Sequence, residues 1–275
     1  MKRSILAFPF AVAAAVLSVS TAAADATSTG CNSKELRATV QRVIDADYRA
    51  DLPALKRGGE ELSKFEPDRN CGARASYWRG YAGWRYATNA SNNEAATRSE
   101  IAEVLRTAAG VLRTSLAKYP DDVEAKIALM GIVQMVPIFL DRGSIEQRDR
   151  MKDAVDLNAE LSLLAHNNPR FLWLRGGTHF WAPAPFGEGP DAALASYFRG
   201  IAFATAQTPT DVIDPSWGLP ELVMSVAYVS AHREKPDLFV ARQFLAAALR
   251  LRPDWSYVRH QLTADIAGRS VGAKQ

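Results

Sequence analysis

Few residues of this 275-residue chain combine the types and spacing that catalysis or metal binding requires. The four histidines lack the His-Glu-x-x-His spacing of a zinc site, and no Gly-x-Ser-x-Gly elbow presents a nucleophilic serine. Asp121 and Asp122 could serve as paired acid/base carboxylates, but after Pro120 they fit better at the start of a helix, where they complement its dipole. The sequence therefore predicts no metal, no cofactor and no catalysis, although a site assembled from scattered residues would leave no motif.

The glycine-rich stretch WAPAPFGEGPD, residues 181–191, raises the question of a phosphate-binding loop. No Gly-x-Gly-x-x-Gly, no Lys-Ser/Thr pair and no strand accompany it, and Glu188 would repel an anion. Pro183 and Pro185 would end the preceding helix, so we interpret the stretch as a structural corner whose aromatic rings form a small core. We expect Trp217, from the next junction DPSWG, to dock beside the rings of Trp181 and Phe186. The predicted structural residues of the corner and this junction are Trp181, Phe186, Gly187, Gly189, Trp217 and Gly218.

Binding chemistry is concentrated in RASYWRGYAGWRY, residues 74–86, where two arginines and two aromatic residues are spaced i, i+4, i+7 and i+11 and share one helix face. A second helix, FLWLRGGTHFW, residues 171–181, would continue this surface. Cationic donors beside aromatic rings suit an extended acidic or C-terminal peptide. The alternative is that the aromatic residues are core and the arginine stems cover them. The predicted groove residues are Arg74, Trp78, Tyr81, Arg85, Arg175 and His179.

The elements that position these residues are predicted to be helices, because Ala, Leu and Arg dominate and Val and Ile rarely alternate with polar residues. A pattern recurs in which core-facing residues at i, i+4 and i+7 precede a proline at i+12. These positions share one helix face, and the proline stops the helix. The copies are Ala108, Leu112, Ser115, Pro120; Ala241, Leu245, Ala248, Pro253; the looser Leu157, Leu161, Leu164, Pro169 and Tyr197, Ile201, Ala204, Pro209; and a doubtful Leu55, Gly59, Leu62, Pro67.

Each copy has the form of the second helix in a tetratricopeptide-like hairpin. The predicted fold is therefore all-α, with degenerate hairpins stacked as an α-solenoid. The prolines lie 40 to 53 residues apart, rather than the about 34 of a regular repeat. An irregular helical bundle with coincidental prolines is the alternative.

The N-terminus has the pattern of a secretory signal peptide. Lys2 and Arg3 precede the apolar run 5–17, and small residues at 21–24 form a cleavage site, so residues 1–24 would be removed. The run is short of the about 20 apolar residues that a membrane span needs. Cleavage would lower the net charge from +3 to about +1, which gives no electrostatic case for nucleic acid or acidic membranes.

Cys31 and Cys71 are the two cysteines of the chain. An even pair in an exported protein favours one disulfide. The alternative is a lipoprotein box, Ser28-Thr29-Gly30-Cys31, with Cys31 acylated. We divide the mature chain into a disulfide-tied helical segment, 25–72, and a tetratricopeptide-like domain, 73–275.

The chain resembles a family of exported bacterial tetratricopeptide-like proteins, mostly without assigned function. The resemblance is carried by NNPRFLWLRGG (167–177), PAPFGEGPDAAL (183–194), DPSWGLPE (214–221) and AALRLRPDWSYVRHQL (247–262). The family's loop usually reads Pro-x-x-Phe-Gly-Gly-Gly, and here Glu188 replaces the middle glycine.

In tetratricopeptide-like stacks the first helices line a concave surface on which partners dock. The first functional hypothesis is therefore a periplasmic or secreted scaffold that binds a protein or peptide partner in this groove. The second is a ligand-holding accessory of a periplasmic solute or lipid transport system, with a transporter component as partner or a small hydrophobic ligand, as the resemblance to helical-repeat partners of such systems implies. An open groove rimmed by arginine would favour the scaffold, and a closed apolar cavity would favour the accessory.

Overall fold

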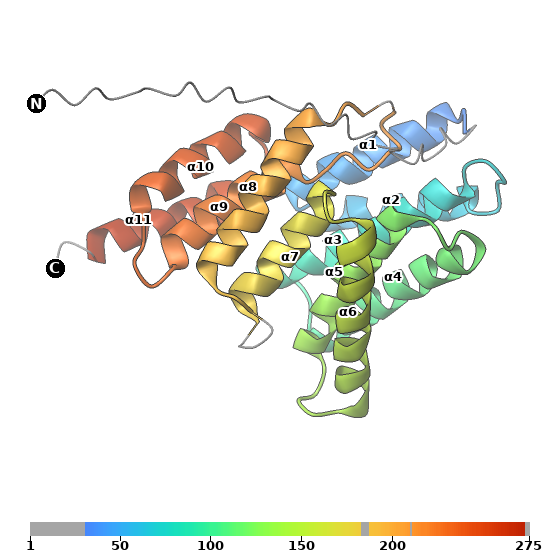
Figure 1. Ribbon diagram of the computed structural model, residues 1–275. Coiled ribbons are helices and arrows are strands. Elements are labelled where there is room, and N and C mark those ends of the chain that lie inside the picture. The colour runs from blue at the N-terminus through green and yellow to red at the C-terminus, as the bar shows by residue number, and fades with distance from the viewer. Residues whose placement is uncertain (1–30, 183–186, 210, 273–275) are drawn as a thin grey trace, which may run out of the picture.

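The computed structural model describes residues 31–182, 187–209 and 211–272, which form helices and no strand (Figure 1). This confirms the all-α class; the predicted signal peptide, residues 1–24, lies outside the described residues. A 3-10 turn (Ser63–Phe65) and a π turn (Val258–Leu262) accompany the α-helices. The α-helices are α1 (Lys34–Arg49), α2 (Leu52–Leu62), α3 (Gly72–Asn92), α4 (Arg98–Lys118), α5 (Val123–Phe139), α6 (Ile145–Leu164), α7 (Pro169–Trp181), α8 (Pro190–Ala206), α9 (Leu219–His232), α10 (Leu238–Leu251) and α11 (Thr263–Gly272).

Consecutive helices pack as pairs: α1 with α2, α3 with α4, α5 with α6, α7 with α8, and α9 with α10. The first helices of successive pairs also contact one another, from α1 to α3, α5, α7 and α9. We call the side of these first helices that carries Arg37, Arg74, Trp78 and Arg170 the inner face. The second helices α2, α4 and α8 pack closely on the first helix that follows them, whereas α6 packs closely on α5 and not on α7.

The recurring core-facing residues at i, i+4 and i+7, which we call the stripe, lie on the second helix of every pair, as their spacing predicts. On α4 the three stripe residues Ala108, Leu112 and Ser115 are all buried, and so are the three on α10. On α6 the stripe fails, because Leu161 is buried while Leu164 is exposed. Each stripe proline lies beyond the end of its helix, and Pro169 also begins α7.

Local sequence explains where the helices begin. Asp122, interpreted above as a helix-start residue, is the N-cap of α5, and its side chain accepts a hydrogen bond from the Ala125 N–H. Thr97 and Glu100 form a reciprocal capping box at the start of α4. None of the described helices is long and apolar enough to cross a membrane.

Most of the buried apolar side chains form one cluster that runs from Cys31 to Ile266, and a smaller cluster, which includes Tyr197 and Leu222, lies between α8 and α9. Close approach between helices depends on small residues at the contact points. A Cβ atom on Gly80 of α3 would lie 2.6 Å from Leu112 of α4, and one on Gly131 of α5 would lie 2.4 Å from the Trp84 ring. The residues preceding α1 are joined to the start of α3 by the predicted disulfide, Cys31–Cys71, which the structure contains.

Candidate functional site

The helix face predicted to line an open groove is buried. Trp78 and Tyr81 are 0% and 1% exposed, and Arg74 and Arg85 are also buried. These four residues therefore do not line an open groove as expected, and the two aromatic rings are packed as the core alternative predicted. The reason is that α3 is covered by α1, α2, α4 and α5 and by a further segment of the chain described below.

Arg85 belongs to a buried polar cluster between α3 and α1. Its Nε donates to both carboxylate oxygens of Asp47 at 2.8 Å, and Tyr81 Oη donates to Asp47 at 2.8 Å. Asn89 donates a third contact at 2.9 Å. Burial opposes the charge of Arg85, but the Asp47 carboxylate outweighs it and raises the pKa of the guanidinium. This cluster is a satisfied core network, because every acceptor of Asp47 is engaged from within the chain.

A second buried carboxylate, that of Glu221 on α9, is 1% exposed. It accepts from Tyr48 Oη at 2.7 Å and from the Gly218 N–H at 2.9 Å. Burial raises its pKa, while Arg85 and the Tyr48 hydroxyl act in the opposite direction. Glu221 thereby connects the start of α9 to α1 through hydrogen bonds.

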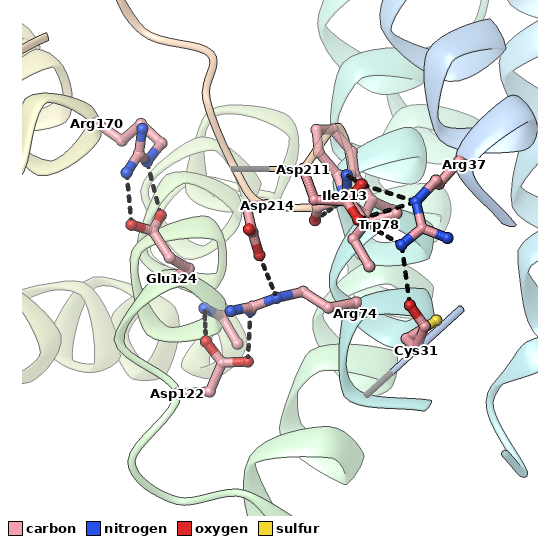
Figure 2. A network of polar contacts seen from close by, with 11 residues as sticks. Cys31, Arg37, Arg74, Trp78, Asp122, Glu124, Arg170, Asp211, Ile213 and Asp214 are labelled. Atoms are coloured by element: carbon pink, nitrogen blue, oxygen red, sulfur yellow. Dashed lines mark hydrogen bonds and ion pairs between the residues drawn. The ribbon is translucent and has the colours of Figure 1, made fainter. Parts of the chain in front are cut away.

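The inner face is occupied by residues 211–218, which precede α9 and which we call the linker. The chain between α8 and α9 runs back toward α1 (Figure 1). Figure 2 shows two of the contacts: Arg37 of α1 binds the Asp211 carboxylate, with Nε–O distances of 2.9 and 3.0 Å, and Trp78 Nε1 donates to the Ile213 carbonyl at 2.8 Å. The hydrogen bond from Arg37 lowers the pKa of Asp211.

Arg74 lies between two acidic residues from different parts of the chain (Figure 2). Its nitrogens lie 3.4 Å from Asp122 of the α5 N-cap and 3.5 Å from Asp214 of the linker. The inner face thus contacts residues 211–214 of the linker at three points. Arg37 and Arg74 face Asp211 and Asp214, respectively. Between these aspartates, the indole N–H of Trp78 donates to the backbone carbonyl of Ile213.

Trp217 anchors the other end of the linker. Its Nε1 donates to Tyr77 Oη at 2.7 Å, and its ring contacts those of Tyr81, Trp84 and Trp173. Arg170 of α7 donates to the Trp217 carbonyl at 3.1 Å, while Glu124 holds the same guanidinium through two further contacts (Figure 2). The anchor is therefore part of the core.

The remaining predicted groove residues lie on α7. His179 is buried and Arg175 is half-buried, and Arg175 Nε donates to His179 Nε2 at 3.3 Å. Among the described residues, the Nδ1 of His179 has no hydrogen-bond partner, and an oxygen of Glu188 lies 3.8 Å away. Burial lowers the pKa of His179. The structure places these two residues against the corner after α7, not in a surface continuous with the α3 arginines.

The predicted corner is confirmed in part. Gly189 has φ +86° and Gly218 has φ +123°, and each is followed by a helix with proline in its first turn. A Cβ on Gly187 would lie 1.9 Å from the Ala182 carbonyl oxygen, so only glycine fits there. Phe186 lies outside the described residues.

The predicted aromatic core of this corner is wrong. Trp181 is 68% exposed and contacts Phe180 and Tyr228, whereas Trp217 is 5% exposed and packs among the α3 rings instead. Trp217 was expected to dock beside Trp181. They are separated because the linker carries Trp217 back to the inner face.

Sequence reasoning missed an exposed row on α6. Met151, Val155, Ala159 and Leu163 are all exposed, and Leu163 is 81% exposed. Their spacing of four residues, which places them in one ridge along a helix, was the available signal. The recurring pattern had instead predicted the neighbouring residues Leu157, Leu161 and Leu164 as the buried face of this helix.

Within the described ranges, no group of three or more His, Cys, Asp or Glu side chains could hold a metal ion. Two shallow surface cavities, of about 190 and 250 Å³, lie between α3 and α4 and against α6, respectively, and include none of the predicted groove residues. No protein-family model, curated protein or solved structure matches this chain.

Proposed function

We propose that this protein is an exported, non-catalytic scaffold of tetratricopeptide-like hairpins that binds a protein or peptide partner on its inner face. The pairing of helices, with first helices in mutual contact, is consistent with such a stack. The disulfide agrees with folding in an oxidising compartment such as the periplasm.

The observation that carries this proposal is the way the inner face holds the linker. Extended peptides are recognised by side chains that bind their backbone and by pockets or charges that select their side chains. Here Trp78 binds the backbone at Ile213, and Arg37 and Arg74 bind two aspartates three residues apart. In this proposal, the linker occupies the position on the inner face that a partner peptide would take.

The two ends of the linker differ in how firmly they are held. Arg37 and Asp211 retain 29% and 24% exposed side-chain area, so water and salt reach this ion pair. Trp217 at the other end is buried among four aromatic residues. We therefore assign residues 211–214 as the part that an extended acidic segment of a partner replaces, while Trp217 stays in place.

A peptide supplied in trans tests this assignment. We would weaken the internal occupant with Asp211→Ala and Asp214→Ala, and measure by fluorescence anisotropy the binding of a labelled, end-blocked peptide with the sequence QTPTDVIDPS. The expected result is binding to this variant, at least about tenfold weaker binding of the peptide with both aspartates changed to asparagine, and loss of affinity at high salt.

The matched control adds Arg37→Ala to the same variant, and this change should reduce the difference between the two peptides, because only Arg74 then remains to bind an aspartate. Equal binding of the aspartate and asparagine peptides to the Arg37-containing variant would refute the assignment of the inner face as a peptide site.

The export part of the proposal has its own test. Mass spectrometry of the mature protein under non-reducing conditions should give a chain that begins at Asp25 and is lighter by two hydrogens than the reduced form. A sulfur atom in the Cys31–Cys71 bond cannot also carry a thioether, so a diacylglyceryl group on Cys31 would refute this part in favour of a lipoprotein.

A further inference from the structure

The helix α6 has an unusual position in the stack. It is 20 residues long, and Leu161 is its single buried residue. It packs closely on α5 but not on α7, although every other second helix that precedes a further pair packs on the next first helix. In Figure 1, α6 extends to the lower edge of the molecule. One side of this helix therefore lacks a partner within the described chain.

The exposed side of α6 carries two adjacent ridges, each with a spacing of four residues. One is the apolar row Met151, Val155, Ala159 and Leu163. The other consists of Arg148, Lys152, Asp156 and Glu160, all exposed. Its charges are thus ordered: two basic side chains in the N-terminal half and two acidic ones in the C-terminal half. Lys152 also pairs with Asp156, and Glu160 pairs with Lys126 of α5.

The geometry points to a second copy of this chain as the partner of α6, with the two α6 helices packed antiparallel about a two-fold axis. In a two-fold interface the same surface is used by both subunits, so the surface must complement itself when turned end for end. The charged row satisfies this condition, because inversion brings the basic half of one α6 opposite the acidic half of the other.

The apolar row supplies the contact between the two helices. Ridges with a spacing of four residues are those that interdigitate in the commonest class of helix packing. The order of charges then sets the direction. In a parallel arrangement the two basic halves would face each other, as would the two acidic halves, whereas the antiparallel arrangement pairs opposite charges and disfavours wrong registers.

Charge reversal tests the interface without removing the apolar row. In the full chain, Arg148→Glu with Lys152→Glu makes the charged row wholly acidic, and Asp156→Lys with Glu160→Lys makes it wholly basic. Sedimentation velocity should show a concentration-dependent dimer for the wild type, at least about tenfold weaker association for each variant alone, and a heterodimer when the two variants are mixed.

The control variant reverses two exposed basic residues far from α6, Lys56→Glu with Arg57→Glu on α2, and should associate like the wild type. Circular dichroism of each variant establishes that it remains folded. The proposal is overturned by a wild type that stays monomeric at high micromolar concentration, by a control that dissociates equally, or by folded acidic and basic variants that fail to associate when mixed.

Discussion

Two helices of almost equal length, α3 and α6, show opposite relations between sequence and environment. Residues 74–86 of α3 carry the arginines and aromatic rings of a typical binding surface, yet 14 of its 21 residues are buried. Residues 145–164 of α6 look unremarkable, yet only one of 20 is buried. Residue types and their spacing therefore locate the side chains suited to binding. The position of a helix in the stack decides whether those side chains are exposed.

The physical cause lies in what covers each helix. The helix α3 is the first helix of the second pair and contacts α1, α2, α4 and α5, and its inner face is closed by the linker. The helix α6 is the second helix of the third pair; it packs closely on α5 and meets α4 through two exposed ion pairs, Arg106–Glu146 and Arg113–Asp153. Burial of an arginine requires a partner, and α3 finds it in Asp47.

The largest effect expected from this comparison is that of Trp217→Ala, which would remove the ring that covers the α3 aromatic residues. Truncating a buried tryptophan costs about 3–5 kcal/mol, a large share of the about 5–15 kcal/mol that a domain has available. The free energy of unfolding should fall by this amount in chemical denaturation followed by circular dichroism.

The matched control is Trp181→Ala, which removes the same side chain from an exposed position. We expect a change within about 0.5 kcal/mol. Equal losses for the two variants would contradict the assignment of Trp217 as a core anchor.

A smaller effect is expected from Asp47→Asn, which keeps the shape of the side chain but removes the charge that Arg85 faces. A hydrogen bond to a charged group is worth about 1.5–3 kcal/mol, and the loss should lie in this range because Arg85 remains buried without an ionised partner. The change Asp156→Asn on exposed α6 should have far less effect. If the two substitutions cost the same, α3 is less enclosed than the structure indicates.

The sequence predicted those parts of the fold that depend on local patterns. The stripe at Ala108, Leu112 and Ser115 located a second helix and its buried face. Asp122 was identified as a helix start from its type and its place after a proline. The cysteine pair was identified from its even number and the export signal alone. The stripe and the helix start depend on residues close together in the sequence. The disulfide could be predicted because the chain has just two cysteines.

The parts that could not be predicted depend on long-range contacts. Arg37 meets Asp211 and Trp78 meets Ile213 across separations of 174 and 135 residues, and no periodicity in either segment indicates this return of the chain. The failed stripe on α6 has the same origin. A helix alone cannot distinguish Leu161, which is buried, from Leu164, which is exposed, because the packing of α6 against its neighbours decides the difference.

The smallest expected effect concerns His179, which was predicted to belong to the same exposed surface as the α3 arginines. If His179 is enclosed like α3, its neutral form is favoured in the folded state, because burial lowers its pKa and Arg175 acts in the same direction while Glu188 opposes them. If it were exposed like the α6 row, folding would leave its titration unchanged.

The sign of the effect on stability follows from linkage. The unfolded histidine has a pKa of about 6.5 and the folded one a lower pKa, so the unfolded state binds more protons between the two pKa values. The stabilisation is complete above the unfolded pKa and is lost as the pH falls through the folded pKa, with a slope of at most about 1.4 kcal/mol per pH unit for one proton. Denaturation of the wild type and of His179→Gln from neutral to mildly acidic pH measures it: the wild type should lose stability faster below about pH 6.5. Parallel curves would place His179 with the exposed residues of α6 instead of with the buried residues of α3.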